Sequence, residues 1–231
     1  MKNFYLTFTF KPLIIPIFCI CLLGLSFISF AKENEVQFKS KEEYLSKGDE
    51  FFEKKLYEDA VGYYEKALSF EPENVDAYTK LGLSYLNMAK YREAQNYFKK
   101  ALQIQPDNFI ARRNLGYIYH LNNEYQKALS EYEKVLALEP KDIPLLYNLG
   151  DCYRSLRMYQ KAKDMAKKIL EIEPTNRLGH FLMGEVYEDT KEYEKALEKF
   201  EIVITNSNIG ENARLRLQER INKLKSLLNR D

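Results

Sequence analysis

Residues 75–108 read VDAYTKLGLSYLNMAKYREAQNYFKKALQIQPDN, and the residue types of this stretch recur at steps of 34 along the chain. A glycine, a tyrosine and an alanine recur in a fixed order five times, and a proline follows them in the first four units. The positions are Gly48, Gly82, Gly116, Gly150 and Gly184; Ala60, Ala94, Ala128, Ala162 and Ala196; Tyr57, Tyr91, Tyr125, Tyr159 and Tyr193; and Pro72, Pro106, Pro140 and Pro174. Four residue types that keep one period indicate internal repeats and hence a repeat architecture.

Each repeat predicts a pair of helices. The units are 41–74, 75–108, 109–142, 143–176 and 177–210. The residue before each unit has a side-chain oxygen that can accept a hydrogen bond from the first turn of the next helix. These expected N-caps are Ser40, Asn74, Asn108, Asp142 and Asn176. The prolines end the second helices. The repeated glycine, together with the alanine twelve residues later, is expected to mark the point where the two helices of a unit cross.

The repeats resemble the tetratricopeptide repeat (TPR) family, whose pattern runs W-x2-L-G-x2-Y…A-x3-F…P. The second unit carries this pattern in Tyr78, Leu81, Gly82, Tyr85, Ala94, Phe98, Ala101 and Pro106. Other units depart from it at single positions, with Arg112 and His180 at the tryptophan position and Ala166 at an aromatic one. The resemblance covers residues 41–210 and implies an all-α fold, a right-handed α-solenoid of five TPR helical hairpins plus a C-terminal capping helix. That helix is expected over 211–231, where leucines and isoleucine, Leu215 included, approximate an apolar stripe.

The first 31 residues differ in composition from the repeats. Lys2 and Lys11 occur without an acidic residue, and the run from 13 to 30 is apolar and uncharged. Small residues stand at both ends of Ser29-Phe30-Ala31. A positive start, an apolar core and such an end are typical of a secretory signal peptide, cleaved here after Ala31.

The alternative to cleavage is an N-terminal membrane anchor that uses residues 12–30, which are near the shortest length that spans a bilayer. Lipidation at Cys19 or Cys21 fits poorly, because the residues before them do not resemble a lipoprotein box. Residues 32–40 are expected to form a polar linker. Either interpretation predicts an exported protein of the periplasm or cell envelope, with membrane contact only if the anchor is retained.

Composition and motifs argue against several classes of function. Lys and Arg total 35 against 34 Asp and Glu, a formal net charge of +1, which disfavours a nucleic-acid partner. Only 2 His occur, so a His-rich metal site is excluded, and we predict no metal and no cofactor. The exported part holds no phosphate-loop, dinucleotide, zinc-protease or nucleophile-elbow motif, so we predict that it is not an enzyme. Cys152 occupies an inter-helix packing position and is expected to be a buried structural thiol.

The candidate site is the concave groove, which the first helix of each unit lines in the TPR family. The inward positions of the third and fourth units include eight polar or aromatic residues: Arg113, Asn114, Tyr117, His120, Tyr147, Asn148, Asp151 and Arg154. Asn114 and Asn148 lie 34 residues apart and would form two rungs able to bind an extended peptide backbone. Carboxylates at both groove ends, among them Asp49 and Glu185, predict an acidic field around this centre.

These features predict a non-enzymatic protein-protein interaction scaffold that binds a partner peptide or protein in the groove. The alternative is a structural, self-associating solenoid whose groove is not a ligand site. The pattern does not identify the partner.

Overall fold

The structure is a computed structural model that describes residues 40–206 and 209–229, and all regular elements in these ranges are α-helices. The described residues belong to one compact unit, Ser40–Asp231. The helices are α2 (Lys41–Glu53), α3 (Tyr57–Phe70), α4 (Val75–Asn87), α5 (Tyr91–Ile104), α6 (Phe109–Leu121), α7 (Tyr125–Leu136), α8 (Ile143–Ser155), α9 (Tyr159–Ile172), α10 (Arg177–Asp189), α11 (Tyr193–Asn206) and α12 (Glu211–Leu228). The expected signal peptide or anchor lies outside the described residues. No helix within 40–206 and 209–229 is long and apolar enough to cross a bilayer.

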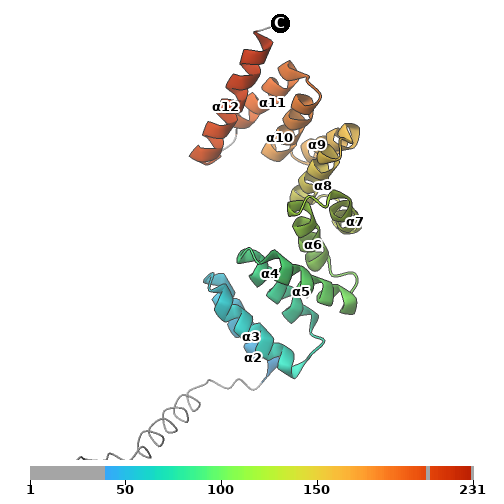
Figure 1. Cartoon of the computed structure of the whole chain (residues 1–231), viewed down its shortest axis with the longest axis vertical. Helices are drawn as coiled ribbons and strands as arrows, with labels where there is room; N and C mark the ends of the chain where they lie inside the picture. The colour runs from blue at the N-terminus through green and yellow to red at the C-terminus, as the bar shows by residue number, and fades with distance from the viewer. Residues whose placement is uncertain (1–39, 207–208, 230–231) are drawn as a thin grey trace, which may run out of the picture. The chain divides into compact units, whose positions relative to one another are not determined.

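The helices form five hairpins in chain order, followed by α12 (Figure 1). The two helices of each hairpin pack together, and the second helix of a hairpin packs on the first helix of the next. First helices also meet one another, α4 with α6, α6 with α8 and α8 with α10. The predicted α-solenoid of TPR hairpins with an added C-terminal helix is confirmed.

The expected N-caps are confirmed in all five first helices. The side chains of Asn74, Asn108 and Asp142 accept a hydrogen bond from the backbone N–H three residues later, at 2.8–2.9 Å. Ser40 does the same at 3.3 Å, and Asn176 bonds two residues on, at 2.9 Å. Each cap satisfies a backbone donor that the helix itself leaves unpaired, so the start of every first helix is set by local sequence.

The repeated glycines of four units make room for an aromatic ring of the second helix. A Cβ placed on Gly48, Gly82, Gly116 or Gly184 would overlap the aromatic ring sixteen residues later, which belongs to the second helix of the same unit. Those rings are Tyr64, Phe98, Tyr132 and Phe200, all almost fully buried. The glycines are therefore required by close packing of a ring against the backbone.

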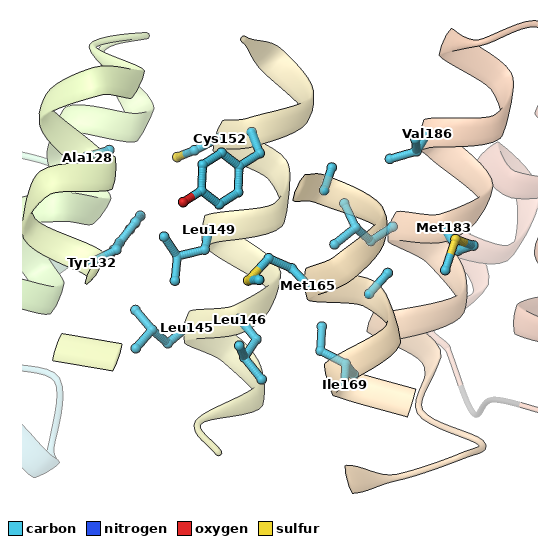
Figure 2. Packing of buried hydrophobic residues seen from close by; sticks show 14 of the residues in the cluster. Ala128, Tyr132, Leu145, Leu146, Leu149, Cys152, Met165, Ile169, Met183 and Val186 are labelled. Carbon is cyan, nitrogen blue, oxygen red and sulfur yellow. The ribbon is translucent and has the colours of Figure 1, made fainter. Parts of the chain in front are cut away.

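The fourth unit fills the same space differently. Ala166 stands where the other units have the ring, and a Cβ on Gly150 would instead overlap Leu182 of α10. Leu182 comes from the next unit and has no exposed surface. The largest buried cluster consequently runs from α7 through α8 and α9 to α10, and Figure 2 shows part of it, from Ala128 and Tyr132 to Met183 and Val186.

Cys152 lies inside this cluster with no exposed surface (Figure 2). Burial, followed by the charge of Asp151, raises the pKa of its thiol to about 12. The thiolate is therefore negligible at neutral pH, and the expectation of an inert, buried thiol is confirmed.

Arg112 and His180, which replace the tryptophan of the family pattern, have a shared polar role. The Nε–H of Arg112 donates to the carbonyl oxygen of Pro106 at 2.7 Å, and the Nε2–H of His180 donates to that of Pro174 at 3.0 Å. The Tyr78 hydroxyl donates to Pro72 in the same way at 2.9 Å. These hydrogen bonds link the start of a unit to the turn before it. His180 therefore has a hydrogen-bonding role in addition to its packing contacts.

The turn inside each hairpin contains a non-glycine residue with positive φ. The five residues are spaced by 34 and have φ between 56° and 63°: Lys55, Ala89, Asn123, Arg157 and Lys191. A Cβ makes this left-handed conformation costly by about 1–2 kcal/mol, less for asparagine. The sequence gives no signal for this conformation except at Asn123, so the fold overrides local preference at the other four turns.

Ala89→Gly is therefore expected to stabilise the protein by about 0.5–1 kcal/mol, because glycine adopts positive φ without the Cβ penalty. Chemical denaturation followed by circular dichroism at 222 nm measures the change. The control is Ala94→Gly in the interior of α5, where glycine should destabilise. A loss of stability in Ala89→Gly would contradict the strain at this turn.

Two buried tyrosines at equivalent positions differ in their hydrogen bonding. The Tyr64 hydroxyl donates to Asp49 Oδ1 at 2.8 Å, whereas the Tyr132 hydroxyl is buried and has no partner among the described residues. Tyr132→Phe should raise the free energy of unfolding by about 1 kcal/mol, because it removes a desolvated, unpaired hydroxyl. Tyr64→Phe should lower it by about 0.5–1.5 kcal/mol. The changes in the free energy of unfolding, measured from the unfolding curves of the two variants, should have opposite signs. Changes of the same sign would refute this difference.

The C-terminal helix α12 covers the last hairpin as predicted. Leu217, Ile221 and Leu224 are buried against Ala196, Phe200 and Val203 of α11. Leu215, which we placed on the apolar stripe, is 57% exposed and is not part of this face. The helix therefore caps the array with an apolar stripe that is narrower than the one predicted from the sequence.

Candidate binding surface

The first helices α2, α4, α6, α8 and α10 form one wall, which we call the groove wall. Ion pairs between successive units identify its exposed face, because they join the sixth, ninth and twelfth positions of neighbouring units. Lys80 Nζ lies 2.6 Å from Asp49 Oδ1, and His120 Nε2 lies 2.8 Å from Asp151 Oδ2. The eight predicted site residues therefore share this wall, but most of them already have partners.

Arg113 and Asn114 are engaged within the protein. Arg113 Nη1 donates to Oδ2 of Asp142, the N-cap of α8, at 3.2 Å. The Asn114 amide donates to the carbonyl oxygen of Ile110, one turn earlier in its own helix, at 2.8 Å. Asn148, the second expected rung, is half-buried and makes no hydrogen bond to a described residue. The two asparagines are thus not equivalent.

His120, Asp151 and Arg154 form a connected charge cluster across α6 and α8. Asp151 accepts from Arg154 Nη2 at 2.7 Å and from Nε at 3.1 Å, in addition to its contact with His120. Burial raises the pKa of the Asp151 carboxyl, but the bonds from His120 and Arg154 outweigh burial and hold that pKa below its usual value. Asp151 is therefore ionised at neutral pH and is already neutralised by its neighbours.

The cluster continues across α10 to the capping helix. Arg154 Nη1 lies 3.0 Å from Asp189, and Arg220 of α12 lies 3.3 Å from Glu185 Oε1 and 2.5 Å from Glu188. Glu185 is only 8% exposed, and its Oε2 has no partner among the described residues. Burial raises the pKa of Glu185, while the charges of Arg154 and Arg220 oppose that rise.

The acidic field that we expected at the groove ends is largely neutralised. Asp49 and Asp76 both face Lys80, at 2.6 and 3.7 Å. Glu185 and Glu188 face Arg220, and Asp189 faces Arg154. Sequence reasoning counted these carboxylates without their basic partners. Lys80 is four residues from Asp76 in the same helix, but the other partners lie 31 to 35 residues away and become neighbours only when units stack.

The groove wall has an apolar stretch, of which the sequence analysis named Tyr117 but not the three leucines. Tyr117 and Leu121 of α6 are each 39% exposed, and Leu83 and Leu86 of α4 are partly exposed at the ninth and twelfth positions. Tyr147, by contrast, is largely packed, and burial raises the pKa of its hydroxyl. The groove wall thus changes character, from apolar in the second and third units to charged and self-paired in the fourth and fifth.

The described residues show no group of three or more His, Cys, Asp or Glu that could hold a metal ion. Cys152 does not form a nucleophile paired with a base, since its thiol is buried in the core.

Comparisons with known proteins agree with this architecture. The family model described as "Tetratricopeptide repeat" matches residues 79–143, one described as "TPR repeat" matches 48–88, and "Anaphase-promoting complex, cyclosome, subunit 3" matches 121–201. Two overlapping repeat models within the array support the TPR repeat family, whose fold is generally a non-catalytic scaffold for protein interactions. A search of the curated proteins finds no match.

Solved structures share the fold at low identity. A tetratricopeptide repeat protein from Parabacteroides merdae is 24% identical, with a TM-score of 0.73 over 83% of this chain and 75% of its own. MamA from Desulfovibrio magneticus RS-1 is 22% identical, with a TM-score of 0.68 over 72% of this chain and 94% of its own. Pseudomonas aeruginosa PilF is 20% identical, with a TM-score of 0.65 over 80% of this chain and 84% of its own.

Proposed function

We propose that the chain is a non-enzymatic scaffold of the cell envelope that binds an extended segment of a partner protein along the groove wall. The observation that carries this proposal is the exposed apolar stretch of α4 and α6, which includes Tyr117 and Leu121. Asn148 holds in the fourth unit the sixth position that Lys80 holds in the second, where Lys80 meets the ninth position of the preceding unit, so we expect the Asn148 carboxamide to face Tyr117. Apolar side chains of a partner would contact the first two residues, and its backbone would bond Asn148. The neighbouring charge cluster, already satisfied, keeps these residues in place.

The test is cross-linking and recovery of partners from the native envelope with three variants. Tyr117→Ala and Leu121→Ala should each reduce recovery, and Asn148→Ala should weaken binding by about 0.5–1.5 kcal/mol for each hydrogen bond lost. Lys168→Ala, at an exposed position of α9, is the matched control and should bind as the parent does. Unchanged affinity in all three groove variants, with circular dichroism intact, would place binding elsewhere.

Export is the second part of the proposal and has its own measurement. Mass spectrometry of the N-terminus should find Lys32 as the first residue if the signal is cleaved after Ala31. An intact Met1 in the membrane fraction supports the anchor instead. A full-length protein confined to the cytosol contradicts both.

Self-association is the second candidate function, and one observation favours it. The residues at the thirtieth position of the first four units are apolar and exposed: Phe70, Ile104, Leu138 and Ile172. They recur every 34 residues, so they lie at the same corner of successive hairpins. Light scattering distinguishes the candidates, since a discrete oligomer that Leu138→Asp dissociates would assign this row to contacts between copies.

A further inference from the structure

An apolar cavity of about 530 Å³ lies at the junction of α10, α11 and α12. Its wall is made of Leu178, Phe181, Val203, Ile209, Ala213 and Leu217. This volume falls within the range of about 300–1,000 Å³ that is typical of small-molecule sites, which are also mostly apolar with a few polar groups. The cavity adjoins the charge cluster at Arg220, and its lining includes no residue of α4 or α6.

Three arginines also line the cavity, and they differ in their partners. Arg220 is neutralised by Glu185 and Glu188, and its guanidinium lies 4.6 Å from the centre of the Phe200 ring. Arg177 and Arg216, in contrast, form no ion pair with any described residue. Arg216 makes one bond, to the backbone oxygen of Asn212 at 3.2 Å. The cavity therefore carries two uncompensated positive charges beside an apolar interior.

We propose that this cavity binds a small amphiphilic carboxylate, a molecule with an unbranched apolar body and one anionic head, such as a medium-chain fatty acid. The body would displace water from the apolar wall, and the head would meet Arg177 and Arg216, whose guanidinium groups match a carboxylate in geometry. The apolar N-terminal segment of this chain fits less well, since its charged residues, Lys2 and Lys11, are both basic. Charge complementarity thus selects an anionic occupant.

Calorimetric titration of the whole protein with hexanoate, octanoate and decanoate, each below its micellar concentration, tests the proposal. We expect one site, with affinity rising about fourfold for each added methylene. Decanol should bind more weakly than decanoate, and the decyltrimethylammonium cation more weakly still. Equal binding of the anion and the cation, or no saturable binding of decanoate, would overturn the proposal.

Variants locate the site within the protein. Arg177→Gln and Arg216→Gln should each weaken decanoate severalfold without changing the affinity for decanol. Both residues are exposed, so neither change is expected to disturb the fold. Ala213→Phe should fill the cavity and abolish binding, whereas Asn222→Phe, also exposed on α12, should not. If decanoate binds Arg177→Gln, Arg216→Gln and Ala213→Phe as it binds the parent, or if only peptides bind the cavity, the assignment is wrong.

Discussion

Leu182→Ala should lower the free energy of unfolding by about 2–5 kcal/mol, the usual effect of truncating a fully buried leucine. The reason is specific to this array, because Leu182 fills the space above Gly150 that a ring fills in the other units. Truncation would leave a void between α8, α9 and α10, where Met165 is the other side chain close to Gly150. Urea denaturation followed by circular dichroism measures the loss.

A second substitution tests whether the side chains at positions 166 and 182 compete for the same space. Ala166→Phe alone should also destabilise, by about 1–3 kcal/mol, since the new ring would collide with Leu182. Combined with Leu182→Ala, the same ring should recover much of the stability by covering Gly150, as Phe98 covers Gly82. Effects that simply add in the double variant would show that the two residues do not compete for one space.

Arg220→Met should destabilise the protein by about 2–3 kcal/mol, because it leaves the buried Glu185 without its nearest cation. Removing one partner of a fully buried pair typically costs about 3–5 kcal/mol. The expected effect is smaller here because Arg154 remains 3.8 Å from Glu185 and Arg220 is partly exposed. Lys223→Met, on an exposed position of the same helix, is the control and should have little effect.

The dependence of this effect on pH follows from the raised pKa of Glu185. A carboxyl whose folded-state pKa exceeds its unfolded value binds more protons in the folded protein, so its contribution to stability falls as pH rises above the unfolded value. Loss of Arg220 would raise the folded-state pKa further. The destabilisation by Arg220→Met should therefore be smaller at pH 5 than at pH 7, and Glu185→Gln should remove most of that difference.

Local signals in the sequence were sufficient for the helices and their order. The N-caps act over three residues, and the prolines and glycines recur at a fixed period, so Asn74 or Pro106 could be interpreted without knowledge of the packing. The rings opposite the glycines were also visible as a pattern. The contact between each ring and its glycine was not visible in the sequence, because Gly82 and Phe98 meet only when the two helices of a unit pack together.

The candidate site was predicted less well, since its properties arise between units. The positions on the groove wall were identified, but the pairing of Arg154 with Asp189 and of Arg220 with Glu185 joins residues 35 positions apart. The sequence therefore indicated several free charges where the structure has closed ion pairs. Tyr117 was expected in the site and is exposed there, whereas Leu121 was not named, because the candidate site was assembled from polar and aromatic residues.

The interior of the fourth unit is completed by Leu182 of the fifth unit, and this dependence limits how the repeats could be recombined. Repeats that complete their own interiors lose only the contacts with neighbouring units when they are deleted, duplicated or exchanged as modules. A cut at the border between 143–176 and 177–210 would instead separate Gly150 from the side chain that covers it. Shuffled or shortened versions of this protein should thus be destabilised more by a junction here than by one elsewhere, so the last two repeats should be moved as a single piece.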